Sequence, residues 1–191
     1  MRLLSYSQSS QSPRLIPDID GNPIFNEENY YIIPVTTTTS TSGLTYTQKE
    51  EECPLYITKE TTENSPGTAV SILSKARTSF ISLDESVSLT FQGSSTPCHH
   101  LLAWDLTLDQ FGHVYITAGH DQFSMDNYLF TITKKDNFET SIYELKYGTG
   151  DSPILGLYED DGLLGFAPNP ILVSFKKAGY FLELPTTSKI Q

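Results

Sequence analysis

The chain has 191 residues, with 23 acidic against 12 basic side chains and a formal net charge of −11. This length fits one domain with a sizeable buried core. The negative charge disfavours nucleic-acid and membrane-surface partners and suits a basic protein. No apolar run is long enough to span a bilayer.

The two ends of the chain differ in composition from its middle. Residues 1–17 are rich in Ser and Gln and predict a flexible arm, and residues 181–191 predict a C-terminal tail. One domain is expected over residues 18–180. The apolar part of Met1–Tyr6 is too short for a signal peptide, so we expect either a cytosolic protein or a mature form without its leader.

Between these ends, short runs of β-forming residues alternate with turn residues, and no stretch keeps a helical period. The chain is therefore predicted to be all-β. The runs at Tyr31, Val87 and Tyr143 lie 56 residues apart, which indicates three units of four strands, a β-trefoil; a two-sheet sandwich fits the same runs. The expected strands are Tyr30–Val35, Leu44–Thr47, Leu55–Thr58, Ala69–Leu73, Val87–Phe91, Leu102–Leu106, Val114–Thr117, Tyr128–Thr133, Ile142–Tyr147, Ile154–Tyr158, Leu163–Phe166 and Ile171–Phe175.

The chain has two cysteines, Cys53 and Cys98. Their spacing alone leaves a disulfide, two buried thiols or part of a metal site open. His99 and His100 follow Cys98, but adjacent residues on a strand point to opposite faces, which suits a shared metal poorly. We expect no metal and no cofactor.

Several motifs occur in an order that resembles one family. Asp20–Ile24, with the sequence DGNPI, precedes Asn29–Ile33, with the sequence NYYII. Further along come Cys53-Pro54-Leu55, Trp104 six residues after Cys98, and the two segments Ile154–Leu157 and Pro170–Lys177. From Ile19 to Lys177 the chain resembles the plant Kunitz protease inhibitors of the soybean trypsin inhibitor type.

The resemblance implies a β-trefoil fold, a disulfide between Cys53 and Cys98, and a secreted, extracellular or vacuolar protein of plant defence. The chain departs from the family in one respect. The usual second disulfide would begin near Gly148, and no cysteine occurs there or later. We therefore expect a variant with one disulfide.

The family's inhibitory loop connects the fourth and fifth strands, which here is Ser74–Phe80. Counting back from Val87–Phe91 places the reactive position on Arg77, with Ala76 before it and Thr78 and Ser79 after the scissile bond. Counting forward from Gly67-Thr68 gives Lys75 instead. Arg77 is preferred because Phe80-Ile81 and the spacing to the fifth strand then match without a gap.

The resemblance also implies how the loop would inhibit a protease. Arg77 would enter the specificity pocket of a trypsin-like serine protease, where a carboxylate pairs with its guanidinium. The loop is expected to be held in an extended, substrate-like shape, with the Asn26 side chain reaching inside and bridging its backbone on both sides of the scissile bond. The expected complex contains one protease per inhibitor, and the inhibitor itself is expected to be a monomer.

Three classes of protein are alternatives to a serine protease inhibitor. An enzyme is disfavoured, because the sequence has no Gly-x-Ser-x-Gly elbow, Gly-rich phosphate loop or His-Glu-x-x-His motif. A protein of the same fold that inhibits a cysteine or aspartic protease through another loop stays open, as does a non-inhibitory storage or defence protein. A carbohydrate-binding trefoil is disfavoured, because Trp104 is the single tryptophan and Gln-x-Trp repeats are absent.

Overall fold

The computed structural model describes residues 14–35, 42–49, 53–93, 96–98, 101–120, 129–135 and 141–179. In these ranges it is all-β, and no helix long and apolar enough to cross a membrane is found there. Its strands are β1 (Asn29–Pro34), β2 (Leu44–Thr47), β3 (Leu55–Lys59), β4 (Val70–Ser74), β5 (Ser86–Phe91), β6 (Trp104–Leu108), β7 (Val114–Ala118), β8 (Phe130–Lys134), β9 (Tyr143–Tyr147), β10 (Gly156–Leu157), β11 (Leu164–Gly165) and β12 (Leu172–Lys177). All twelve expected strands are confirmed, and their starts differ from the prediction by at most two residues.

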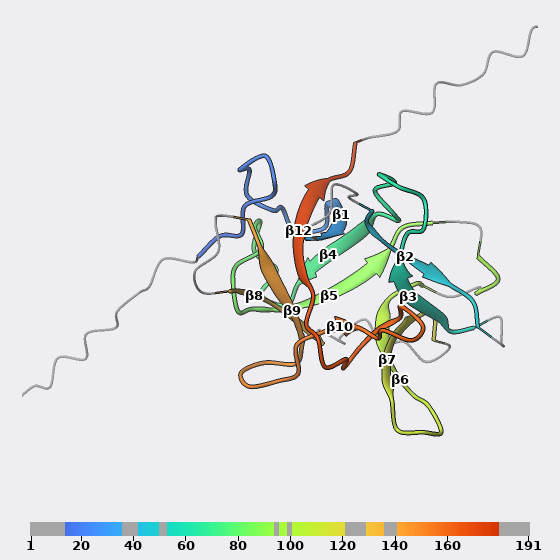
Figure 1. Cartoon of the computed structure of the whole chain (residues 1–191). Helices are drawn as coiled ribbons and strands as arrows, with labels where there is room; N and C mark the ends of the chain where they lie inside the picture. The colour runs from blue at the N-terminus through green and yellow to red at the C-terminus, as the bar shows by residue number, and fades with distance from the viewer. Residues whose placement is uncertain are drawn as a thin grey trace, which may run out of the picture.

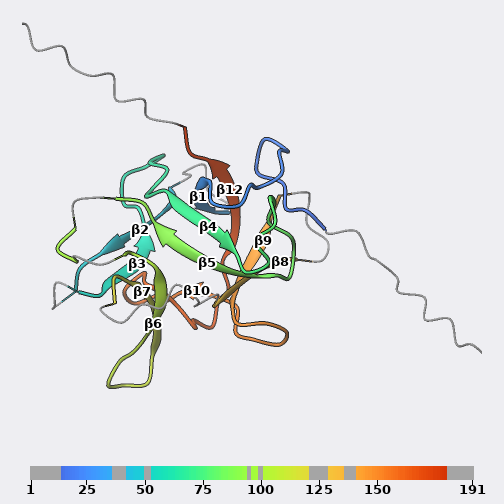
Figure 2. The same cartoon turned by 180° about the vertical axis from the view of Figure 1, so that it is seen from behind.

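Six of the strands close a barrel in the order β1-β12-β9-β8-β5-β4. The other six form the pairs β2–β3, β6–β7 and β10–β11, which cap the barrel (Figure 1). The three units begin with β1, β5 and β9, whose first residues are 29, 86 and 143. This spacing of 57 residues agrees with the sequence repeat and confirms the β-trefoil over the sandwich. Figure 2 shows the β6–β7 hairpin projecting away from the barrel.

The barrel interior is filled by alternate side chains along its strands. In β4, for example, Val70, Ile72 and Ser74 are buried, while Ser71 and Leu73 face outward. Trp104 is the largest fully buried side chain, and its ring lies 5.2 Å from that of Phe91 and 5.8 Å from that of Phe130. Burying a side chain of this kind stabilises the fold by roughly 1.5–3 kcal/mol.

The disulfide between Cys53 and Cys98 is confirmed, and the two Cα atoms are 5.6 Å apart. It joins the segment before β3 to the segment before β6. The bond closes 45 residues of chain, so it restricts the unfolded state considerably. His99 and His100 lie outside the described residues.

The described part of the expected N-terminal arm is packed against the barrel. Ile16 has no exposed surface, Leu15 pairs with Ser82, and Arg14 forms an ion pair with Asp84. The apolar character of residues 15–17 explains this packing, which the Ser- and Gln-rich composition of the preceding residues obscured. The packed domain thus includes residues 14–17, while residues 1–13 and the expected tail, 181–191, lie outside the described residues.

Candidate functional site

The loop between β4 and β5 contains the five residues predicted to face a protease. Lys75, Ala76, Arg77, Thr78 and Ser79 are all exposed. The residues on either side are not: Ser74 is fully buried, Phe80 is half-buried and Ile81 is fully buried. We call residues 75–79 the Arg77 loop. It is a short exposed segment between two anchored ends.

Asn26 links Ser74, the residue before the Arg77 loop, to Ser79, the last residue of the loop. Its side-chain Oδ1 accepts a hydrogen bond of 2.7 Å from the backbone N–H of Ser74. Its own backbone N–H donates to the carbonyl oxygen of Ser79 over 3.0 Å. We expected the side chain alone to bridge both sides of the loop. Instead the side chain holds one end and the backbone holds the other, and no described residue accepts a hydrogen bond from Asn26 Nδ2.

The segment that carries Asn26 is itself fixed. Phe25 pairs with Phe80 as an antiparallel bridge, their ring centroids lie 5.0 Å apart, and Ile81 N–H donates to Ile24 O over 2.9 Å. The Tyr30 hydroxyl accepts the N–H of Phe25 at 2.9 Å. Burial raises the pKa of Tyr30, which outweighs the opposing effect of that N–H, so the hydroxyl stays neutral at physiological pH.

The Arg77 loop is a tight turn, which differs from the extended shape that the sequence led us to expect. The N–H of Arg77 donates to Ser74 O over 3.1 Å, and the N–H of Ala76 donates to Ser74 Oγ over 3.1 Å. Arg77 has a φ of 53°, in the left-handed region that costs a residue with a side chain roughly 1–2 kcal/mol. A Ser hydroxyl that captures nearby backbone N–H groups favours such local turns over extended chain.

Ser74 was placed at the start of the loop, but its part in holding the loop was not predicted from the sequence. It accepts two hydrogen bonds from the loop and donates its N–H to Asn26. A signal was available, because the alternation of Val70, Ile72 and Ser74 places a small polar side chain inward at the last position of the strand.

The two basic candidates differ in their backbone environment. Lys75 N–H donates to Ser86 O over 3.0 Å, so Lys75 continues the ladder between β4 and β5. Arg77 and Thr78 lie beyond that ladder, and the Thr78 hydroxyl donates to Phe80 O over 2.7 Å. No described carboxylate forms an ion pair with either basic side chain.

The described residues contain no group of three His, Cys, Asp or Glu side chains placed to hold a metal ion. The Arg77 loop is positively charged and solvent-exposed, and Asn26 is hydrogen-bonded on both sides of it.

The chain is similar to known protease inhibitors over most of its length. The family model of trypsin and protease inhibitors called Kunitz legume matches residues 16–177. A curated relative, "Trypsin inhibitor 2" of Psophocarpus tetragonolobus, is 28% identical over 174 residues, which is 84% of this chain and 95% of the relative. Both descriptions are those of inhibitors rather than enzymes.

Solved structures share the fold. Soybean trypsin inhibitor in complex with porcine pancreatic trypsin matches with a TM-score of 0.71 and 24% identity, covering 86% of this chain and 99% of that one. The water-soluble chlorophyll protein of Brassica oleracea var. Botrytis, with chlorophyll b, matches with a TM-score of 0.70 and 21% identity over 87% and 99% of the two chains. One fold thus carries different functions, and the function of this chain depends on its site.

Proposed function

Because the chain belongs to the Kunitz legume family of trypsin and protease inhibitors, we propose that it inhibits a trypsin-like serine protease through Arg77. The observation that carries the proposal is the Arg77 loop: an exposed basic residue on a segment whose two ends are both hydrogen-bonded to Asn26. A guanidinium entering the specificity pocket forms a charge-assisted, bidentate contact with the carboxylate at its base.

The tight turn of the Arg77 loop has to open when a protease binds. A protease binds the peptide before the scissile bond in an extended form, so the hydrogen bond from Arg77 N–H to Ser74 O opens and Arg77 leaves its left-handed φ. When Arg77 leaves that region, its local backbone strain is relieved. The fixed ends at Ser74 and Ser79 limit the conformational entropy that the loop loses on binding.

The anchors also explain why cleavage would not destroy the complex. After hydrolysis between Arg77 and Thr78, Ser74 stays bonded to Asn26 Oδ1 and Ser79 stays bonded to the Asn26 N–H. The two new ends remain close together, which favours resealing over release. Arg77 is favoured over Lys75 because Lys75 belongs to the ladder with β5.

The proposal has three corollaries. One Arg77 loop per chain supports a complex of one inhibitor with one protease, in which the inhibitor acts as a monomer. The Cys53–Cys98 disulfide supports a secreted, extracellular or vacuolar protein, because disulfides persist in oxidising compartments. A role in plant defence follows if the target is a digestive enzyme.

The test is a titration of trypsin, chymotrypsin and papain with the pure protein. We expect residual trypsin activity to fall linearly to near zero at one equivalent, chymotrypsin to be inhibited weakly, and papain to be unaffected. Inhibition of papain or of an aspartic protease, with trypsin untouched, would place the function on another loop. No inhibition of any of these enzymes would indicate a non-inhibitory storage or defence protein.

A further inference from the structure

The outer face of β4 leads directly to the Arg77 loop. Because side chains alternate along a strand, Ser71 and Leu73 point outward, and the next outward position is Lys75. β5 runs beside it, with Thr90 opposite Ser71 and Ser88 opposite Leu73. Any protein that covers the loop therefore also approaches this face.

This face contains a concavity of about 270 Å³, which we call the β4–β5 groove. Two leucines, Leu73 and Leu101, line it together with polar residues of both strands, and Glu27 is the one charged residue among the described residues in the lining. Leu101 is 49% exposed. The groove thus combines aliphatic walls with one negative charge.

Glu27 is held in place by its backbone. It follows Asn26, its N–H donates to Ile72 O over 2.9 Å, and its φ is 65°. No described cation forms an ion pair with its carboxylate.

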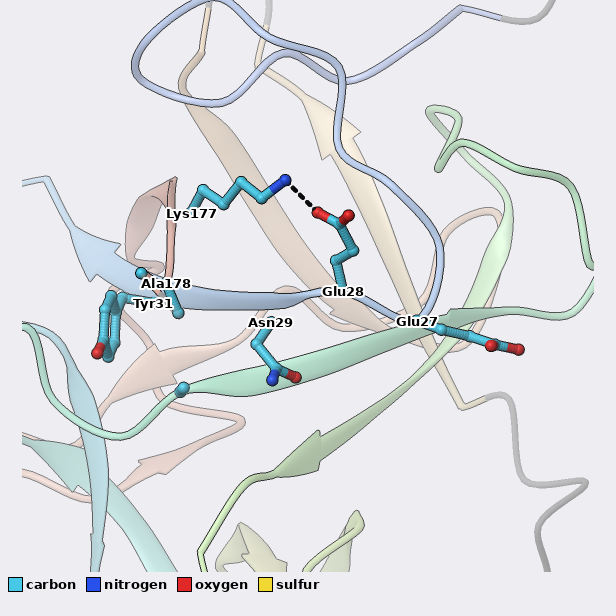
Figure 3. A pocket seen from close by; sticks show the side chains of 8 residues that line it. Glu27, Glu28, Asn29, Tyr31, Lys177 and Ala178 are labelled. Atoms are coloured by element: carbon cyan, nitrogen blue, oxygen red, sulfur yellow. Dashed lines mark ion pairs between the residues drawn. The ribbon is translucent and has the colours of Figure 1, made fainter. Parts of the chain in front are cut away.

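The neighbouring residue, Glu28, is different. A second concavity of about 410 Å³ lies on the other side of Glu27, and there Glu28 is paired with Lys177. Figure 3 shows the Glu28 carboxylate directed at Lys177, while the Glu27 side chain points away from both. The charge of Glu28 is therefore already compensated within the chain, and the charge of Glu27 is available to a partner.

We propose that the β4–β5 groove is a second contact site, which binds a lysine or arginine side chain of the protease that the Arg77 loop engages. This inference rests on the proposed function. The aliphatic stem of such a side chain packs along the two leucines, and its charged end pairs with Glu27. Ser71 lies three residues before the end of β4, about 10 Å from the loop. A protease covers roughly 800 Å² of its inhibitor, a patch with a radius of about 16 Å, so the groove lies within its reach.

The consequence is selectivity among proteases that share the same specificity pocket. A charge at the rim of an interface acts mainly on the association rate and on its salt dependence. Proteases with a basic residue facing the groove are bound faster, and those with an acidic residue there are repelled. The net charge of −11 acts in the same direction over a longer range.

The experiment compares Glu27→Gln with Glu63→Gln, which removes the same charge from another exposed position outside the groove. Association rate constants are measured with a cationic trypsin at low and high salt. We expect Glu27→Gln to slow association about two- to fivefold at low salt, with the difference shrinking at high salt, and Glu63→Gln to change it much less. Leu73→Ala, which removes an aliphatic wall, should weaken binding at both salt concentrations.

Equal effects of Glu27→Gln and Glu63→Gln would show that only net charge matters and would overturn the groove proposal. So would unchanged binding by both Glu27→Gln and Leu73→Ala. A parent protein that did not inhibit trypsin would overturn the proposed function, and the groove proposal with it.

Discussion

Two exposed loops of this protein are held in different ways. The Arg77 loop depends on Asn26, which lies 48 positions before Ser74. The tip of the β6–β7 hairpin, residues 109–113, is closed by its own first residue: Asp109 Oδ1 accepts the N–H groups of Phe111 and His113, each over 2.8 Å. Figure 1 shows the two loops in separate parts of the molecule, and Figure 2 agrees.

The shape of each loop is therefore fixed by a different part of the chain. The hairpin tip carries its geometry in five consecutive residues, so a cut within it would separate Asp109 from the groups it holds. The Arg77 loop has a local turn at Ser74, but its two ends are also held from outside by Asn26, so a cut at Arg77–Thr78 leaves both anchors intact. The hairpin tip has two large apolar side chains that are exposed, Phe111 at 77% and Leu108 at 68%. Exposure alone is not sufficient, because a loop that is cut and resealed also requires an anchor from a distant segment.

The largest effect is expected from removing the basic side chain of the Arg77 loop. Arg77→Ala should weaken trypsin inhibition by at least about 100-fold, because it leaves the carboxylate of the specificity pocket desolvated and unpaired. Arg77→Lys should retain most of the inhibition, and Lys75→Ala should matter far less. Inhibition constants for trypsin provide the measurement.

The matched control is Phe111→Ala in the other loop, which should leave inhibition unchanged. Catalytic trypsin at mildly acidic pH should cut the parent at the Arg77–Thr78 bond alone, as read by mass spectrometry. Should Lys75→Ala be the damaging change, the reactive position lies two residues earlier.

Removing the disulfide should lower the stability of the whole fold without changing how the two loops are held. Replacing both Cys53 and Cys98 with Ser should lower the free energy of unfolding by roughly 2–4 kcal/mol, measured by urea denaturation. Cys53 lines a concavity together with Phe111 of the hairpin tip, and no residue of the Arg77 loop belongs to that lining. The folded variant should therefore still inhibit trypsin; loss of inhibition without unfolding would contradict this separation.

A smaller effect, specific to the Arg77 loop, is expected from Asn26→Ala. It leaves the buried Ser74 N–H unsatisfied, at a cost of about 1–3 kcal/mol, while the backbone anchor at Ser79 remains. Trypsin should then hydrolyse the loop slowly, which chromatography of a long incubation would detect.

Asn26→Asp is the informative partner of that variant. It keeps the oxygen that accepts the Ser74 N–H and removes the Nδ2 donor. If Asn26→Asp resists hydrolysis as the parent does, the acceptor alone supports the loop. Resistance of Asn26→Ala itself would mean that Asn26 is only a turn residue.

The smallest effect should be confined to the hairpin tip. Burial raises the pKa of Asp109, but the N–H groups of His113 and Phe111 and the His113 side chain outweigh it and lower the pKa below its ordinary value of 3.8. With the folded pKa below the unfolded one, the stabilisation is present above pH 3.8 and is lost as the pH falls through the folded pKa.

The amide resonances of Phe111 and His113 should therefore move as the pH falls below 3.8 and Asp109 takes up a proton. In Asp109→Ala they should be displaced at every pH and exchange faster with solvent. Trypsin inhibition by Asp109→Ala should equal that of the parent. A change in inhibition would show that the two loops are coupled.

Local sequence determined much of this protein. Alternating apolar residues and turn formers placed all the strands within two residues, and the repeat through Tyr31, Val87 and Tyr143 matched the three units of the trefoil. The resemblance to the family predicted the disulfide, which is confirmed. It also pointed to the Arg77 loop and to Asn26, whose part in inhibition stays a prediction. These features were readable because strand alternation and turn composition act over a few neighbouring residues.

The conformation of the site depended on contacts between distant segments. The division of the anchor between the Asn26 side chain and backbone was not expected from the sequence. The turn that Ser74 closes and the left-handed Arg77 were also missed, although their hydrogen bonds are local. The contrast between Glu27 and the paired Glu28 was not expected either. A hydrogen bond or ion pair between residues tens of positions apart forms only when the barrel brings them together, and no local pattern encodes its geometry.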